Sequence, residues 1–295
     1  MLLLSPAMKR SYLAALVLVA ACQRPQPEAA DPARTSETTQ PALSATAAAT
    51  WQRVAPFLRG VWVKTDYLTA IRRTRSPLAA SSKLTDIVAL SIDPRQAAGD
   101  SLTVGASLNN HEGAGFKALL RQGLQLSSLP TTWPDYEQPT NFYELSYLVA
   151  APDTVVLLNK YNQQKRLLQS LRFSRVPGVA FSATAPSDGL QYFVNRQLLA
   201  GTYTATDAKG TKKQVQFSPN GQVEGLDGFR QYYLATDFVV TVENNLDNII
   251  FDIGTKRQQD FVYTISQDTV RLYQARVQDP DLLRGPLQYT LVRTR

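Results

Sequence analysis

The chain has 295 residues, of which 31 are basic and 24 acidic, and its formal net charge is +7. The single cysteine and the single histidine exclude an internal disulfide, a Cys-based metal site and any site that needs two imidazoles. The basic residues are scattered and form no recognition motif, so nucleic acid is not an expected partner. The modest positive charge favours anionic surfaces such as phospholipid or lipopolysaccharide.

The first 21 residues have the organisation of an export signal. A basic start, Met8-Lys9-Arg10, precedes an apolar run from Tyr12 to Val19, and two small residues follow. This order predicts a secretory signal peptide over residues 1–21. The apolar run is shorter than the roughly 20 residues that a transmembrane helix needs.

The segment Val19-Ala20-Ala21-Cys22 resembles the lipobox of bacterial lipoproteins. The resemblance implies that Cys22 becomes the first residue of the mature protein and carries acyl chains such as palmitate. Gln23 follows in place of an aspartate, which by the same resemblance implies transport to the outer membrane, on its periplasmic or cell-surface face. The alternative is an ordinary cleaved signal in which Cys22 has no role.

The segment after Cys22 has the composition of a disordered chain. Residues 23–50 are mostly Pro, Ala, Thr, Ser, Gln and Glu, with no aromatic residue and one leucine, Leu43. Such a composition cannot bury enough apolar surface to offset the entropy lost on ordering. We therefore expect residues 22–50 to be a lipidated, disordered tether.

Three segments recur in the same order in the two halves of the remaining chain. The matching pairs are Leu58–Asp66 with Leu199–Asp207, Asp153–Leu157 with Asp268–Leu272, and Leu171–Arg175 with Leu287–Arg293. An internal repeat of this kind indicates homologous domains. We expect domain 1 over residues 51–178, a linker over 179–189 and domain 2 over 190–295.

Alternation of apolar and polar residues predicts strands in both domains. Leu199, Gly201 and Tyr203 share one face of a strand whose other face carries threonines. Asn220-Gly221 is a hairpin signal. Further strands are expected over 85–92, 101–108, 115–121, 124–128, 142–149, 154–160, 166–175, 229–238, 249–253, 261–266, 269–274 and 287–293. Short strands at hairpin spacing predict a mainly all-β fold of two antiparallel meanders, each closed into a barrel.

Domain 1 carries a short helical insertion near residues 67–80. Asp66 is expected to cap a helix that holds Leu68 and Ile71. Ser76 and Pro77 end that helix and suit the start of a second one. The Pro-rich stretch 130–139 is expected to be a loop.

A glycine and an aromatic residue opening the first strand, with an arginine closing the last, resemble the lipocalin and lipocalin-like β-barrels. Gly60, Trp62 and Arg175 match in the first domain. In the second domain Gly201 matches, Tyr203 replaces the tryptophan, and Arg293 is the arginine. The resemblance implies that each arginine lies over the aromatic ring and closes one end of a barrel.

His111 and Glu112 are a candidate site between two predicted strands. One interpretation is a polar site in which Glu112 acts as acid or base beside the imidazole of His111. The other is a hairpin, because Asn, His and Gly tolerate positive φ. No motif supplies a nucleophile or a metal partner, so the hairpin is favoured and no catalytic residue is assigned.

No metal or cofactor is expected. Glu243, Asp247 and Asp252 are spaced too widely for a calcium loop, which favours solvated loop charge. The many aromatic residues of domain 2 either line a pocket or fill the barrel. Filling is favoured, because an eight-stranded barrel has room only for side chains or one small ligand.

Together these features favour a non-enzymatic, lipid-anchored envelope protein that binds a small apolar or amphipathic ligand or a protein partner. The alternatives are a hydrolytic or transferase enzyme that uses His111 and Glu112, and a purely structural envelope protein. A cavity of about 300 Å³ or more with convergent polar groups would favour ligand binding.

Overall fold

The computed structural model describes residues 41–295, except for 110–111, 151–152, 180, 182–186, 239–244, 279–280 and 295. The predicted signal peptide, Cys22 and most of the predicted tether therefore lie outside the described residues. Within the described ranges, no helix is both long and apolar enough to cross a membrane.

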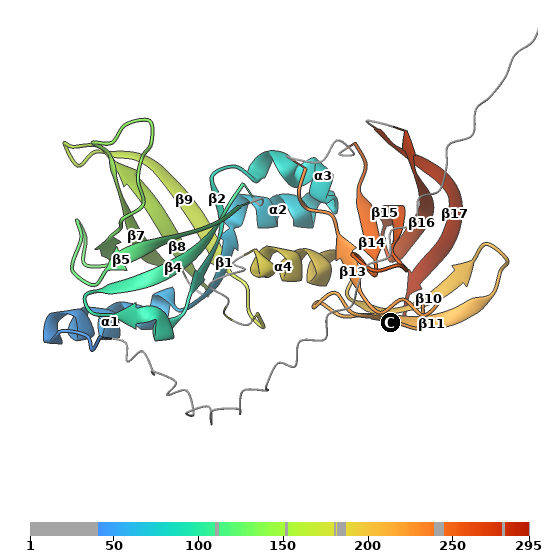
Figure 1. Cartoon of the computed structure of the whole chain (residues 1–295), viewed down its shortest axis with the longest axis horizontal. Coiled ribbons are helices and arrows are strands. Elements are labelled where there is room, and N and C mark those ends of the chain that lie inside the picture. The colour runs from blue at the N-terminus through green and yellow to red at the C-terminus, as the bar shows by residue number, and fades with distance from the viewer. Residues whose placement is uncertain are drawn as a thin grey trace, which may run out of the picture. The chain divides into compact units, whose positions relative to one another are not determined.

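The first half of the chain forms one antiparallel sheet. Its strands are β1 (Gly60–Lys64), β2 (Ile87–Ile92), β3 (Ala97–Ala98), β4 (Ser101–Leu108), β5 (Glu112–Leu119), β6 (Ser128–Pro130), β7 (Phe142–Ala150), β8 (Asp153–Tyr161) and β9 (Leu167–Arg175). Their order is β3-β4-β2-β1-β9-β8-β7-β6, and β5 pairs with β4 (Figure 1). The strand expected over 101–108 coincides with β4.

The second half forms a second antiparallel sheet. Its strands are β10 (Gly201–Asp207), β11 (Lys212–Phe217), β12 (Val223–Glu224), β13 (Tyr232–Leu234), β14 (Asn248–Phe251), β15 (Gln259–Ser266), β16 (Thr269–Gln278) and β17 (Asp281–Arg293). Their order is β12-β11-β10-β17-β16-β15-β14-β13. The mainly β architecture with antiparallel sheets is therefore confirmed.

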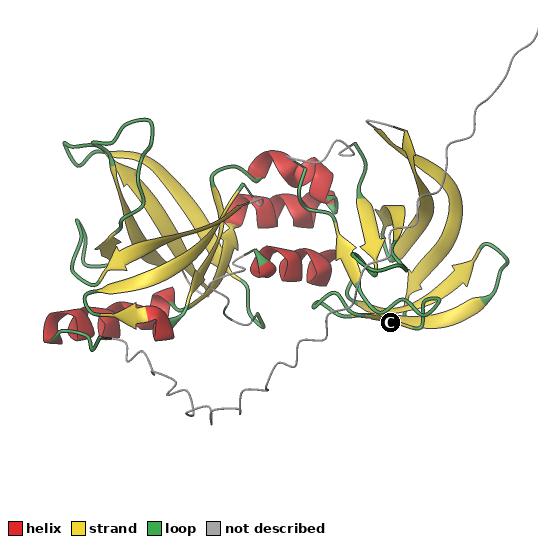
Figure 2. Cartoon of the chain, viewed as in Figure 1, coloured by secondary structure: helices red, strands yellow, loops and turns green. Residues whose placement is uncertain are grey.

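Both sheets curl, as Figure 2 shows, and their outer strands come together at isolated bridges. In the first sheet Ala118 of β5 bridges Thr131, just after β6. In the second, Gln222 bridges Gln231 between β12 and β13. A closed barrel needs a continuous ladder between neighbouring strands, and in the described residues each seam holds only a single bridge.

In the described part of the chain, four α-helices accompany the sheets: α1 (Ala45–Leu58), α2 (Thr65–Thr74), α3 (Pro77–Ala80) and α4 (Asp188–Leu198). The short 3-10 helices η1 (Ser81–Lys83) and η2 (Pro94–Gln96) lie in the first half. The insertion expected near 67–80 is α2 with α3. As predicted, Pro77 is the first residue of α3, and the Ser76 hydroxyl accepts the N–H of Ala79 at 3.0 Å. Asp66 lies inside the first turn of α2, because Lys64 occupies the cap position.

Helices α1 and α4 correct two sequence-based expectations. α1 begins at Ala45, five residues before the expected end of the tether at residue 50, and α4 begins inside the expected linker. The buried residues of α1 are Ala47, Thr50, Val54 and Leu58, which recur at the spacing of one helix face. This pattern is not evident from the sequence, because alanine and threonine at positions 45–50 are only weakly apolar. Ser44 caps this helix by accepting the N–H of Ala47 at 3.3 Å.

The same junction joins a helix to a strand in both halves. In the first, the Trp62 indole Nε1 donates to the carbonyl of Leu58 at 2.7 Å. In the second, the Tyr203 hydroxyl donates to the carbonyl of Leu199 at 2.8 Å. Carbonyls at a helix C-terminus lack partners within the helix, so each aromatic side chain satisfies one of them.

A glycine and an arginine complete each junction. Gly60 and Gly201 have φ of 151° and 143°, which disfavours any other residue. A Cβ on Gly60 would lie 3.2 Å from the Arg175 Nε, so the small residue also gives the guanidinium room. In register, Arg175 is the partner of Trp62 across β1 and β9.

The two arginines are held differently. Arg175 lies 4.8 Å from the Trp62 ring centroid, and its Nη2 donates to the carbonyl of Phe57 at 3.3 Å. Arg293 lies 4.9 Å from the Tyr203 ring and donates to the Ala200 carbonyl at 2.7 Å and to the Tyr203 hydroxyl at 2.6 Å. The two short hydrogen bonds make Arg293 the more firmly bound, although tyrosine is the poorer π partner.

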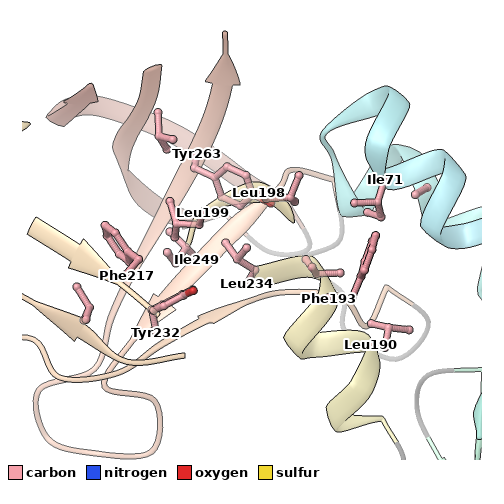
Figure 3. Close-up of a cluster of buried hydrophobic side chains, with 14 of the residues drawn as sticks. Ile71, Leu190, Phe193, Leu198, Leu199, Phe217, Tyr232, Leu234, Ile249 and Tyr263 are labelled. Carbon is pink, nitrogen blue, oxygen red and sulfur yellow. The ribbon is translucent and has the colours of Figure 1, made fainter. Parts of the chain in front are cut away.

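The halves share a hydrophobic core. The cluster around the second sheet contains Ile71 of α2 together with Leu190 and Phe193 of α4 (Figure 3). It also contains Val63 of β1, and α4 contacts both β1 and β13. Thus the helices inserted in the first half pack into the core of the second sheet. A separate cluster, with Leu58 and Trp62, joins α1 to the first sheet.

We predict that Arg175→Met lowers the free energy of unfolding by about 1 kcal/mol, because an exposed cation–π contact contributes about 0.5–1 kcal/mol. Arg293→Met should cost about 2 kcal/mol, because two short hydrogen bonds are lost as well. Urea denaturation measures both, with Arg172→Met, an exposed arginine of β9, as the control. A larger loss at Arg175 than at Arg293 would contradict this account.

Candidate functional site

The first sheet has a pocket at the end that is remote from Trp62 and Arg175. Strand β9 carries Leu171 and Gln169 four and six residues before Arg175, which places them roughly 13–20 Å from it. There the structure has a cavity of about 360 Å³, called here the mouth pocket. It is lined by Asp86, Ile87, Leu108, Trp133, Pro134, Asp135, Tyr136, Glu137, Tyr143, Lys160, Gln169 and Leu171.

The mouth pocket has an apolar base and an aromatic wall. Ile87 and Leu171 are buried in the core of the first sheet. The Trp133 ring packs edge-on against Phe116, with centroids 5.7 Å apart. Tyr136 is 85% exposed at the rim, which leaves its ring free to contact a bound molecule. An apolar cavity with few polar groups is the usual form of a small-molecule site.

An ion pair fixes the polar side of the pocket. The Asp135 carboxylate is 2.5 Å from the Lys160 ammonium, and Asn141 donates to it at 2.8 Å. Backbone N–H groups of Glu137 and Gln138 also donate to it, both at 3.2 Å. The bond to Lys160, followed by that to Asn141, lowers the pKa of Asp135 to about 2.

Lys160 contacts both the acid and an aromatic ring. Its Nζ lies 5.9 Å from the Tyr143 ring centroid, and the bond to Asp135 raises its pKa above the ordinary value. The pocket therefore places the Asp135–Lys160 ion pair above an apolar floor, and the exposed carboxylates of Asp86 and Glu137 also border it. This arrangement can orient a molecule that has one polar and one apolar end.

Residues 130–139, which carry part of this site, were expected from the sequence to be only a loop. The signal was present in Trp133-Pro134-Asp135-Tyr136, where two aromatic residues and an acid are concentrated in a proline-rich segment. Prolines restrict the backbone, and Asp135 then binds two of the loop's own N–H groups. Lys160 lies 25 residues away on β8, and only the sheet brings it to Asp135.

The predicted pair His111 and Glu112 is not assembled into a site by the described residues. His111 lies outside them. Glu112 is exposed at the start of β5, opposite Leu108, and does not line the mouth pocket. Asn109 has φ of 49°, the conformation that a hairpin turn requires.

Two of the three acidic residues considered as calcium ligands, Asp247 and Asp252, have structural partners. Glu243 lies outside the described residues. Asp247 accepts the N–H of Leu78 at 2.9 Å, and burial raises its pKa. Asp252 accepts N–H groups of Arg230 and Gln231 at 2.9 and 3.1 Å. In the described part of the chain, no cluster of three or more His, Cys, Asp or Glu residues has the arrangement of a metal site.

The aromatic residues of the second half pack against one another. Ring centroids are 4.7 Å apart for Phe229 and Phe251, 5.2 Å for Phe217 and Tyr232, and 5.6 Å for Phe251 and Phe261. All of these side chains are buried. They fill the concave side of the second sheet, which leaves the mouth pocket of the first sheet as the better candidate.

Another cavity, of about 460 Å³, lies between α4 and the second sheet. Two of its lining amides are bonded within the protein: Gln191 donates to the Leu234 carbonyl and Asn195 donates to the Pro219 carbonyl, both at 3.1 Å. These bonds attach α4 to the second sheet. These two amides therefore stabilise the fold and are less available to bind a ligand.

We predict that the Asp135 carboxylate stabilises the folded protein at neutral pH and that this stabilisation is lost in acid. Because its folded pKa lies below the ordinary 3.8, its contribution is complete above about pH 4 and is lost as the pH falls toward about 2. Asp135→Asn should lower Tm at pH 7, and the difference from wild type should shrink between pH 4 and pH 2. Circular dichroism melts measure this, with exposed Asp281→Asn as the control. A difference that does not change with pH would refute it.

Comparison with known proteins does not assign the chain to a family. No protein-family model matches the chain, and no curated protein matches it. Conclusions about function therefore rest on the sequence motifs and on the mouth pocket.

Proposed function

We propose that this protein is a lipid-anchored protein of the bacterial outer membrane that binds a small amphipathic ligand in the mouth pocket. The observation that carries the binding role is the pocket itself, in which the Asp135–Lys160 pair lies beside an aromatic wall and an apolar floor. Its volume of about 360 Å³ falls within the range of small-molecule sites.

The two ends of the first sheet support this assignment. At one end, Arg175 lies over Trp62 and α1 packs on the sheet, since Phe57 stacks on Tyr147 with ring centroids 4.3 Å apart. The other end carries the cavity. By the lipocalin resemblance the arginine closes one end, and the mouth pocket lies at the other end of the first sheet.

The ligand chemistry follows from the lining. Lys160 offers an ammonium group to an anionic or hydroxylated head, and Asp135 holds that ammonium in place. Ile87 and Leu171 offer apolar surface to a short hydrocarbon portion. Trp133 and Tyr136 can cover the ligand from the side of the loop.

Fluorescence titration with a dansyl-labelled fatty acid tests the binding role. Wild-type protein should bind the probe, and Trp133→Ala and Lys160→Met should each weaken binding about tenfold, the loss expected for one aromatic or charge-assisted contact. Trp51→Ala, which removes a tryptophan of α1, is the matched control and should bind as wild type does. Native mass spectrometry of the purified protein should show a co-purifying small molecule that Lys160→Met loses. Equal binding by all three variants would overturn the proposed site.

The anchor is tested separately. Cys22→Ser should abolish incorporation of radiolabelled palmitate and release the protein from membranes, because it removes the only thiol of the chain. Gln23→Asp is the matched control: it should keep the label and, by the sorting resemblance, leave the outer-membrane fraction. Persistent membrane association of the Cys22→Ser protein, together with an unlabelled wild type, would exclude a lipid anchor.

A further inference from the structure

A second cavity, of about 300 Å³, lies near the arginine that contacts Trp62. It is lined by Arg72 of α2, Asp153 and Thr154 of β8, and Ser174 and Arg175 of β9. A third arginine, Arg59, is close enough to act on Arg175 electrostatically. Guanidinium groups from three separate elements therefore gather at one place on the surface.

Each of these guanidinium groups is supported by an aromatic ring. Arg59 lies 5.8 Å from the Phe181 ring centroid and Arg72 lies 5.2 Å from that of Phe193. Arg175 lies 4.8 Å from the Trp62 ring. A ring engages the flat face of a guanidinium and leaves the N–H groups at its edge available to an acceptor.

Those N–H groups have few acceptors within the protein. The Nη2 of Arg175 donates to the Phe57 carbonyl at 3.3 Å, which is a long bond. Across the described ranges, no ion pair includes any of the three arginines. Arg72 and Arg175 are exposed, so their free edges are open to a ligand.

Three cations gather around a single lining carboxylate, that of the exposed Asp153, which leaves an excess of positive charge. Partial burial, followed by the charge of Arg59, lowers the pKa of Arg175. A guanidinium does not deprotonate at ordinary pH, so a bound anion is the available way to relieve the repulsion. We infer that Arg72 and Arg175, with Arg59 beside them, bind a phosphate group, either a free phosphate or the phosphate of a lipid headgroup.

The remaining lining residues fit an oxyanion. The Thr154 hydroxyl can donate to a phosphate oxygen, and the Ser174 hydroxyl, 2.9 Å from that of Thr65, borders the cavity. Asp153 is the one acidic lining residue, and it is exposed. The planar fork of arginine matches the geometry of phosphate oxygens, which a lysine ammonium does not.

Isothermal titration of the full chain in neutral detergent tests the site with two probes, inorganic phosphate and dihexanoylphosphatidylglycerol below its micelle concentration. Wild type should bind at least one of them at low salt. Arg72→Gln and Arg175→Lys should each weaken that binding about tenfold or more, Arg175→Lys because it keeps the charge and loses the fork. Arg284→Gln is the matched control, because Arg284 also lies over a ring, 4.9 Å from that of Tyr273, on the other sheet.

Each outcome decides the inference. Binding of both probes with the same sensitivity to Arg72→Gln identifies a general phosphate site, and binding of the lipid probe alone identifies a headgroup site. Arg72 lies outside the Trp62 junction, so Arg72→Gln should lose no more stability than its exposed cation–π contact with Phe193 contributes and should stay folded at the titration temperature. A melting curve of this variant separates loss of binding from loss of fold. Absence of heat with both probes, or equal loss in Arg284→Gln, would overturn the inference.

Discussion

The fold depends on how each sheet is joined to the helix that precedes its first strand. A helix ends with carbonyl groups that lack partners, and a strand begins two or three residues later. Trp62 and Tyr203 resolve this by donating to the carbonyls of Leu58 and Leu199, and an arginine of the last strand then covers the ring. One small unit thus satisfies a helix end, fixes the direction of the first strand and pairs the first strand with the last.

The same junction separates two kinds of chemistry in the first sheet. At the junction end, cations gather because aromatic rings support their flat faces. At the far end, Ile87 and Leu171 form an apolar floor, and the loop before β7 brings an aromatic wall and an acid. Lys160 reaches that acid because β8 runs toward the far end of the sheet. The two sites are thus placed by strand direction, and neither needs residues from the second sheet.

The interior of the second sheet is a packed aromatic core, unlike the far end of the first sheet, which carries the mouth pocket. Its aromatic residues stack on one another, and the helices α2 and α4 complete its core. Gly189 lets α4 approach β1 closely, since a Cβ at that position would collide with Val61. The first sheet, which carries the mouth pocket, is thereby attached to the second half of the chain through a shared set of buried side chains.

The sequence by itself determined most of the strands, the repeat and the residues of each junction, because these depend on local alternation, turn chemistry and short motifs. The strand expected over 124–128 is absent apart from Ser128, the first residue of β6. The expected strand over 101–108 and the start of α3 at Pro77 show how far local rules extend. Features that depend on contacts between distant parts of the chain could not be predicted from the sequence. The composition of helix α1 gives little sign of an ordered segment. The helix is ordered because Val54 and Leu58 are buried against the first sheet. The pairing of Asp135 with Lys160, and the meeting of Arg72 with Arg175, also required the tertiary structure. Each joins residues on different elements, and only the packing of those elements brings the charges within reach of one another.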